Sequence, residues 1–340
     1  MGSLIKDFEK APIARGVFYG GNAGAKEAVI FNDNVWMVKY PKTTRDLLNP
    51  QISYTTSPLS EYLGSKIYEL LGLPVHEVML GVRKNKIVVA CKDFTRQTDD
   101  MLITAEAALR LGVNKELEGA LVPLTYIART LIPFHDLKNS FMSSDLDEYS
   151  GTGSETFLDE VLATIQGEAA LQGVDGVLER FWDMFVIDAF IGNNDRNNGN
   201  WGLLWNHDTG VAELTPVYDN GNAFFNKRSL KQMEKRLTDE EAMKQDAYGT
   251  LVCVYKYTGL DNEGHQIHPF RFIRETEDLD CKAAVMRFLE RVDMNEIRGL
   301  IESIPESIGN LSVMPNIQKE FYKELLTIRL AEFKGSVDDA

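Results

Sequence analysis

The sequence predicts an α+β fold with two lobes, a small β-rich one followed by a larger and mainly helical one. Strand patterns and one helix fill about the first ninety residues, whereas apolar spacings of three and four dominate from about residue 95 onward. A short hairpin at residues 200–218 interrupts the helical part. A chain of 340 residues is also long for a single hydrophobic core. We therefore expect one lobe in residues 1–94 and the other in residues 95–340.

The first lobe is predicted to hold a small sheet and one helix. The strands fall at residues 12–19, 26–31, 35–40 and 86–91, with the helix at 58–71. In the third strand, alternation puts Lys39 on one face together with Met37, and Trp36 on the other. Ser57 is the predicted N-cap of the helix, and Pro58 fits its first position.

Helical periodicity dominates the second lobe. The predicted helices cover residues 102–112, 119–132, 157–173, 178–191, 283–303 and 314–334. A stretch rich in Ser, Asp and Gly at residues 139–155 is predicted to be an exposed loop. Residues 200–206 and 211–218 are apolar-rich runs joined by a turn that ends in Thr209-Gly210, which predicts the hairpin.

The chain is strongly acidic, with a net charge of −15 and a pI near 4.9. Such a surface repels nucleic-acid backbones and anionic membranes unless a local basic patch overrides it. Residues 227–236 (KRSLKQMEKR) come nearest to a basic cluster. We interpret them as a solvated helix face in preference to a phosphate-binding patch. No nucleic-acid or membrane partner is therefore expected.

The cysteines and the N-terminus bear on location. Cys91, Cys253 and Cys281 are widely spaced and odd in number, which favours a reducing compartment over a disulfide framework. The sequence has no basic and apolar leader with a cleavage site, and no long charge-free apolar run. We therefore expect a cytoplasmic protein.

The most specific segment is the polar loop of residues 191–201 (IGNNDRNNGNW), which follows a strongly apolar helix. Asp195 can orient an attacking hydroxyl, and Asn200, five positions later, offers an oxygen to Mg²⁺. The hairpin then returns the chain to the same place, where Asp219 supplies a second metal-binding oxygen. Asp and Asn are also the usual turn formers, so each residue alone has a plain structural explanation. The combination and its order predict phosphoryl transfer.

Three features of the first lobe fit the same chemistry. Lys39 is suited to contact the α- and β-phosphates, and Glu61 in the next helix is suited to hold that lysine as an ion pair. A glycine cluster offers backbone amides to phosphates through Gly20, Gly21 and Gly24. The alternatives are an edge-strand lysine, a carboxylate that complements the helix dipole, and an ordinary hairpin turn. The order of these parts along the chain favours the catalytic interpretation.

The sequence resembles the HipA-like serine/threonine kinases, which are distantly related to protein and phosphoinositide kinases. The resemblance rests on Trp36 to Lys39, on Gly72 to Val75 after the Glu61 helix, on Asn193 to Asn200, and on Val217 to Gly221. It covers most of residues 15–225 in order. The chain is shorter than full-length HipA toxins, and in this it is similar to a short, stand-alone branch that includes a cell-translocating kinase.

The resemblance implies a two-lobed protein-kinase-like fold that uses ATP and Mg²⁺. It implies that Asp195 is the catalytic base, that Asn200 and Asp219 are metal ligands, and that Lys39 holds the phosphates. It places Tyr218 against the nucleotide and makes Cys91 and Asp93 the hinge residues whose backbone groups face adenine. Asn197 lies in the nucleotide site where the family usually has His, and an amide cannot carry the charge of an imidazole.

The family also phosphorylates itself on hydroxyl residues near the nucleotide. Residues 53–57 (SYTTS) lie in a polar stretch between Lys39 and Glu61, which is either such a site or a loop with a helix cap. An antitoxin partner is left open by the resemblance.

The leading hypothesis is thus an ATP-dependent, autophosphorylating serine/threonine-protein kinase with an unidentified protein substrate. The alternatives are a small-molecule kinase on the same scaffold, a nucleotide-binding pseudokinase or scaffold, and an interaction domain that binds basic partners. The complete set of Lys39, Asp195, Asn200 and Asp219 argues against the pseudokinase.

Overall fold

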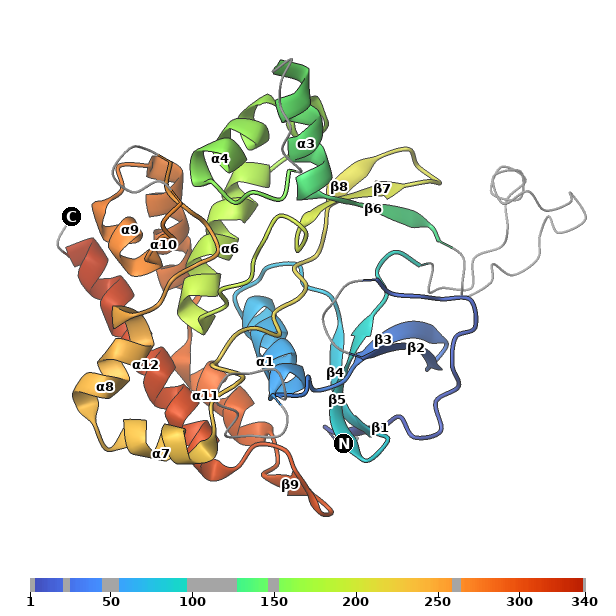
Figure 1. Cartoon of the computed structure of the whole chain (residues 1–340), viewed down its shortest axis with the longest axis vertical. Coiled ribbons are helices and arrows are strands. Elements are labelled where there is room, and N and C mark those ends of the chain that lie inside the picture. The colour runs from blue at the N-terminus through green and yellow to red at the C-terminus, as the bar shows by residue number, and fades with distance from the viewer. Residues whose placement is uncertain are drawn as a thin grey trace, which may run out of the picture.

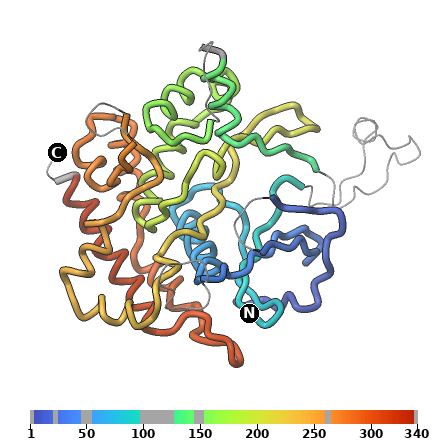
Figure 2. Tube along the Cα trace, in the orientation of Figure 1, coloured from blue at the N-terminus to red at the C-terminus, as the bar shows by residue number. Residues whose placement is uncertain are grey.

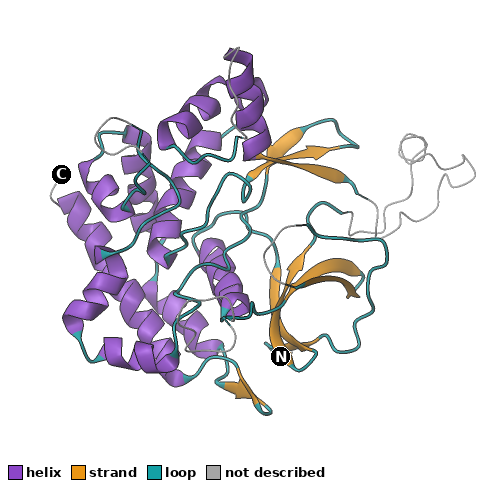
Figure 3. Ribbon diagram, in the orientation of Figure 1, coloured by secondary structure: helices purple, strands orange, loops and turns teal. Residues whose placement is uncertain are grey.

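The computed structural model describes residues 4–20, 25–44, 55–96, 127–145, 153–258 and 264–338. A strand-rich lobe lies beside a larger helical lobe, as the sequence predicts (Figures 1 and 3). The first-lobe residues, blue and cyan in Figure 2, lie together in the lower right and centre of the view, and most of the residues after 127 lie to their left and above them. The boundary that we place after residue 94 stays a prediction.

The first lobe is built on a five-stranded sheet. Its strands are β1 (Lys6–Asp7), β2 (Lys26–Phe31), β3 (Asn34–Lys39), β4 (Val78–Arg83) and β5 (Lys86–Lys92), in the order β1-β4-β5-β3-β2. Neighbouring strands are antiparallel except for the parallel pair β1–β4. Two-residue turns join β2 to β3 and β4 to β5, and all four turn residues have positive φ. This backbone matches the twist of paired strands.

The two faces of the sheet belong to different hydrophobic clusters. Phe8, Trp36 and Val38 pack together on the outer face. The inner face is covered by helix α1 (Ser57–Leu70), whose Leu63 belongs to the main core together with Val89. Helix α1 contacts β4 and β5 on one side and the helical lobe on the other. Because of this position, Glu61 on α1 and Lys39 on β3 both lie near the junction of the lobes.

The helical lobe surrounds one buried helix, α6 (Val177–Ile191), which contacts α4, α9, α10 and α12. Phe181, Trp182 and Phe190 of α6 are completely buried. The other helices are α3 (Phe134–Asp145), α4 (Leu158–Gly167), α5 (Ala169–Gln172), α7 (Leu230–Leu237), α8 (Glu240–Lys244), a π-helical turn (Gln245–Gly249), α9 (Pro269–Glu275), α10 (Leu279–Arg291), α11 (Met294–Ser303) and α12 (Asn316–Asp338). This packing makes the C-terminal end of α6 a rigid base for the loop that follows it.

Short sheets complete the second lobe. Strands β6 (Arg129–Pro133), β7 (Gly202–Asn206) and β8 (Ala212–Leu214) form an antiparallel sheet in that order. Strands β9 (Ser307–Ile308) and β10 (Leu311–Ser312) form a separate pair. The β7–β8 hairpin confirms the prediction, and it returns the chain from Asn200 to Tyr218.

Several predicted elements are wrong in detail. Residues 12–19 form no strand beyond one bridge from Ile13 to Val29, because Pro12 lacks an amide hydrogen and Gly16 has a φ of 80°. The N-cap of α1 is Thr56, while Ser57 is its first residue. Residues 129–132, predicted as the end of a helix, belong to β6, since a short apolar run fits either structure.

Two further segments differ. The predicted loop at 139–155 begins inside α3, whose exposed face is polar, and strand β4 had no prediction. The predicted helix at 102–112 and the part of 119–132 before residue 127 lie outside the described residues. Within the described residues, no helix is both long and apolar enough to cross a membrane.

Candidate active site

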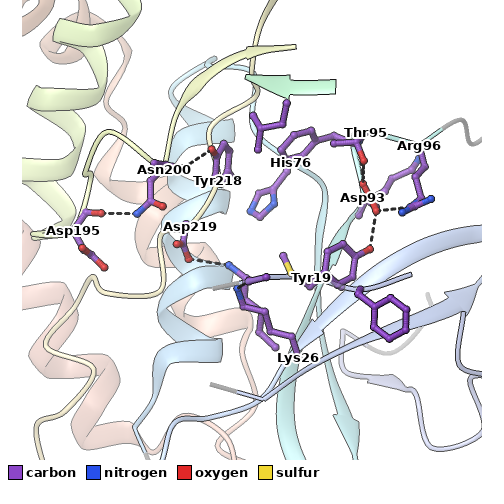
Figure 4. Close-up of a pocket in the computed structure, with 18 of the residues that line it drawn as sticks. Tyr19, Lys26, His76, Asp93, Thr95, Arg96, Asp195, Asn200, Tyr218 and Asp219 are labelled. Carbon is purple, nitrogen blue, oxygen red and sulfur yellow. Dashed lines mark hydrogen bonds and ion pairs between the residues drawn. The ribbon is translucent and has the colours of Figure 1, made fainter. Parts of the chain in front are cut away.

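A cleft of about 690 Å³ lies between the two lobes (Figure 4). It is lined by β2 and β3, by the segment after β5, by the loop after α6 and by the residues after β8. Its volume is in the range of sites for small ligands and cofactors. Although the chain is acidic, five cationic side chains line the cleft: Lys26, Lys39, Lys42, Lys92 and Arg96.

Lys39 joins the lobes through two ion pairs. Its Nζ lies 3.0 Å from Glu61 Oε2 and 3.0 Å from Asp219 Oδ1. Burial alone lowers the pKa of the Lys39 ammonium, but the two carboxylates raise this pKa overall well above its usual value. The Lys39 charge in turn lowers the pKa of Asp219. Lys39 is therefore a permanent cation, and both of its partners are ionised.

A second lysine, Lys26, lies next to Lys39 on the neighbouring strand. Lys26 on β2 is the direct cross-strand partner of Lys39, and its side chain lines the cleft (Figure 4). Burial and the Lys39 charge lower the pKa of Lys26. Like charges directly opposite each other in a sheet are destabilising. An anion in the cleft would relieve this repulsion, so the pair is suited to hold phosphate groups.

The loop after α6 begins at a glycine that no other residue can replace without strain. Gly192 has a φ of 71°, and a Cβ there would lie 2.7 Å from the buried Arg329 guanidinium. The loop then folds around Asp195. Asn193 Oδ1 accepts a hydrogen bond from the Asp195 amide, and Asn197 Nδ2 donates to Asp195 Oδ1 at 3.1 Å. The asparagines thus fix both the backbone and the carboxylate of Asp195.

Asn200 and Asp219 have oxygens suited to bind a cation. Asn200 Nδ2 donates to the Asp195 carbonyl at 2.7 Å, and within the described residues no donor reaches its Oδ1. Asp219 uses Oδ1 for Lys39, while no described residue donates to Oδ2. Its φ of 60° is uncommon for a residue other than glycine. A carboxylate and an amide oxygen on one cleft fit the ligand preference of Mg²⁺.

Arg196 holds the two halves of this site together. It is only 2% exposed, and its Nε donates to Asp188 Oδ2 of α6 at 2.8 Å. The same guanidinium donates to the Asn200 and Tyr218 carbonyls and to Asn220 Oδ1. One buried side chain therefore fixes the distance between the Asp195 loop and the Asp219 segment.

A buried polar chain continues from Arg196 into the first lobe. Asn220 Nδ2 donates to Ser65 Oγ of α1 at 3.1 Å, and Ser65 Oγ lies 3.3 Å from His76 Nε2. His76 Nε2 in turn lies 3.0 Å from Glu61 Oε1, on the side of the carboxylate away from Lys39. Close packing supports this chain, because a Cβ on Gly64 would lie 2.7 Å from Asn220 Cβ.

The segment after β5 differs from the predicted hinge. Cys91 is buried between Met37 and Val78 in the sheet, and the Asp93 amide and carbonyl bond to Val35 and Arg96. The Asp93 carboxylate is also occupied, since it accepts from Tyr19, Thr95 and Arg96. The two residues therefore have no backbone group to offer a ligand. Phe94 lines the cleft, and its amide bonds to no described acceptor.

The remaining predicted residues are only partly brought together. Tyr218 lines the cleft with its ring 5.4 Å from that of Phe94, and its hydroxyl donates to the Gly199 carbonyl. Asn197 and Gly20 also line the cleft. Gly21 and Gly24 lie outside the described residues.

Four residues that contribute to the site were given no role from the sequence alone: Lys26, His76, Tyr19 and Asn220. A fifth, Arg196, left a signal, because Asp188 interrupts the apolar run at residues 184–191 of α6. A buried carboxylate needs a cationic partner, and Arg196 follows eight residues later in the polar loop.

Comparison with known proteins gives a consistent result. No family model matches the chain. A curated relative, the serine/threonine-protein kinase CtkA of Helicobacter pylori, is 30% identical over 322 residues, which cover 94% of this chain and 82% of the relative. The crystal structure of the Helicobacter pylori proinflammatory kinase CtkA matches with a TM-score of 0.76 at 27% identity, and the match covers 98% of this chain and 99% of that one.

A HipA from Shewanella oneidensis, solved with HipB and operator DNA, matches with a TM-score of 0.49 at 11% identity, over 96% of this chain and 68% of that one. The similarity to CtkA is higher in identity, and the structural match to CtkA spans nearly the whole of both chains. The chain therefore belongs to the family of serine/threonine-protein kinases represented by CtkA.

Proposed function

We propose that the interlobe cleft transfers the γ-phosphoryl group of Mg²⁺-bound ATP to a serine or threonine hydroxyl of a protein. One observation carries the proposal: a half-buried lysine, paired with two carboxylates, faces a loop that holds a third carboxylate beside an amide oxygen. Phosphoryl transfer needs positioning and charge neutralisation more than covalent chemistry from the protein. These groups supply both.

The nucleotide has a defined orientation in this proposal. Lys39 and Lys26 contact the phosphates, because both side chains line the cleft and a bound phosphate would offset the repulsion that remains between them. Tyr218 and Phe94 pack against the adenine, and the Phe94 amide replaces the predicted Cys91 and Asp93 as the hinge donor. Tyr19 bonds to Asp93 at 2.8 Å, which holds the chain before the glycine cluster close to the hinge.

Each catalytic residue has a separate role in the proposed reaction. Asp219 Oδ2 and Asn200 Oδ1 would hold Mg²⁺, which neutralises charge on the phosphate oxygens. Asp195 accepts a hydrogen bond from the acceptor hydroxyl, orients it in line with the γ-phosphorus, and takes its proton as the new O–P bond forms and ADP leaves. Asn197 holds the Asp195 carboxylate in position for this step.

Autophosphorylation belongs to the same proposal. Ser53 and Tyr54 lie outside the described residues, and Thr56 Oγ1 bonds to the Asn226 carbonyl. Ser57 lines a narrow cavity together with Asp195 and Asp219. Among the described hydroxyls of residues 53–57, Ser57 is therefore the best placed acceptor.

The direct test is transfer of label from ATP in the presence and absence of metal. With Mg²⁺, we expect γ-labelled ATP to label the chain or a protein substrate, and α-labelled ATP to label neither. EDTA is expected to abolish the label, and excess Mg²⁺ to restore it, because Asp219 and Asn200 need the metal to bind the phosphates. Metal-independent labelling, or labelling from the α-phosphate, would contradict the proposal.

The buried polar chain through His76 gives a separate prediction. His76→Phe removes the nitrogen between Ser65 Oγ and Glu61 Oε1, so the Lys39–Glu61 pair loses its link to Asn220. We expect kcat/KM for ATP to fall by about 2–30-fold, the range for coupling through packed networks. His76→Gln should restore part of the loss because its amide can donate to Glu61. His265→Phe, at an exposed position, is the control. Equal kinetics for His76→Phe and the control would exclude this role.

A further inference from the structure

We propose that a basic surface beside the Asp195 loop binds an acidic segment of the protein substrate, close to the hydroxyl that is phosphorylated. This inference rests on the proposed function, since it names the substrate class of the same site. Its starting point is a second cavity of about 300 Å³. The cavity lies between Asn194 of the catalytic loop, the segment 222–228, and the first turns of α7.

The cavity lies next to the reaction site. Asn222 lines it and also lines the narrow cavity that contains Asp195, Asp219 and Lys39. Asn222 Nδ2 donates to Asn194 Oδ1, directly before Asp195 in the chain. An extended peptide advances about 3.3–3.6 Å per residue. A peptide whose hydroxyl reaches Asp195 therefore has its next few side chains over this cavity.

The charge of the cavity rim is opposite to that of the molecule. Residues 227–236 contain five basic residues and one acid, Glu234, for a net charge of +4, whereas the whole chain carries −15. Two of the basic residues, Arg228 and Arg236, pair with the buried Asp246. Their role is structural, because they attach this segment to the π-helical turn.

Three lysines remain, and we refer to Lys227, Lys231 and Lys235 as the lysine ridge. All three are exposed, and within the described residues none of them forms an ion pair. Lys231 and Lys235 are four residues apart on α7, so they project from the same face of the helix about 6 Å apart. Lys227 itself lines the cavity. The ridge thus extends the cavity as a row of uncompensated positive charge.

The ridge is held in a fixed place relative to the catalytic loop. Ser229 and Gln232 form a capping box at the start of α7. The Arg228 guanidinium lies 4.3 Å from the centre of the Phe225 ring, and Met233 is completely buried. Because the backbone that carries the lysines is already ordered, less conformational freedom is lost on binding than in a flexible segment.

Carboxylate side chains are the ligands that match this surface. Exposed lysines attract Asp and Glu of an extended segment, steer its approach, and lose strength as salt is added. The acidic remainder of the chain repels the same segment elsewhere, which favours binding at the ridge alone. The solvated helix face predicted for residues 227–236 is confirmed by the exposed lysines, and the neighbouring cavity gives that face a use.

The test uses three serine peptides that differ only in the residues around the acceptor: Glu-rich, Gln-rich or Lys-rich. Transfer of label measures kcat/KM for each, and fluorescent versions with Ala in place of Ser measure affinity by anisotropy without turnover. We expect the Glu-rich peptide to exceed the Gln-rich one by about 10-fold in both at low salt, as a few exposed ion pairs would give. The preference should shrink at high salt.

The matched variants carry Lys227→Gln, Lys231→Gln and Lys235→Gln, or, as the control, Lys10→Gln, Arg15→Gln and Lys334→Gln at other exposed positions. The ridge variant should lose the preference for the Glu-rich peptide, and the control should keep it. Anisotropy tests the ridge separately from the kinase activity. If the chain binds the Glu-rich peptide preferentially in a salt-sensitive way but transfers no phosphate, only the proposed function is contradicted. Equal affinities for the three peptides would overturn the ridge. Binding of single-stranded RNA and of phosphatidylserine vesicles is measured as well. A ridge variant that loses only the binding of these two ligands, and keeps its preference for the Glu-rich peptide, would also overturn the proposal.

Discussion

Asp195→Ala is expected to lower kcat for phosphate transfer by about 10³-fold, within the range for removal of a general base. The affinity for Mg²⁺ and ATP should change little, because Lys39, Asn200 and Asp219 remain in place. The Asp195 carboxylate contacts only Asn197 among the described side chains. Its loss therefore leaves the buried contacts of the loop intact.

Two measurements on the same preparation check this expectation. Initial rates with labelled ATP give kcat, and the rise in melting temperature with Mg²⁺ and ATP reports binding. Asp175→Ala, at an exposed position just before α6, is the control for removal of a carboxylate. A variant at Asp195 that still transfers phosphate at the rate of this control would assign the base to another residue.

Arg196→Ala is expected to lower the free energy of unfolding by about 3–5 kcal/mol, the usual cost of breaking a buried ion pair from one side. Asp188 would stay in the core without its cation, next to Asn193 and Tyr68. The Asn200 and Tyr218 carbonyls would also lose a charged donor. Activity should fall as well, since the Asp195 loop and the Asp219 segment lose their common anchor.

Denaturant unfolding at neutral pH measures the stability change, and activity is then compared at a temperature where the variant remains folded. Arg271→Ala is the matched control, because Arg271 forms an exposed pair with Glu275 one helical turn away. Such pairs contribute about 0.3–0.5 kcal/mol. If both arginine variants cost the same small amount, Arg196 would not be the structural anchor that its contacts indicate.

Much of the fold could be predicted because its signals are local. Alternation in residues 34–39 fixes the faces of β3, and the apolar run at 178–191 marks α6. The errors arise where neighbours decide the structure. Residues 129–133 are a strand because β7 pairs with them. Residues 12–19 make only one bridge, because Pro12 and the positive φ of Gly16 interrupt an otherwise apolar run. Short apolar runs carry no periodicity that separates these outcomes.

The catalytic residues divide in the same way. Asp195 and Asn200 share one loop, and a hairpin returns Asp219 to it, so spacing along the chain is enough to propose them together. Lys26 could be recognised as part of the site only from its pairing with Lys39, because a shift of one residue in strand register would place its side chain on the other face of the sheet. The hinge stays a prediction: Asp93, a polar residue at a strand end, resembles a ligand-facing group, but its carboxylate bonds to Tyr19 and Arg96.

The most direct measurement is a crystal structure with a non-hydrolysable ATP analogue and Mg²⁺, or with Mn²⁺ located by its anomalous signal. The account predicts a metal bound by Asp219 and Asn200, at about 2.0–2.1 Å for Mg²⁺. It also predicts phosphates contacting Lys39 and the terminal phosphate facing Asp195. A nucleotide bound in this cleft with its phosphates directed away from Asp195, or a metal held by other residues, would contradict it.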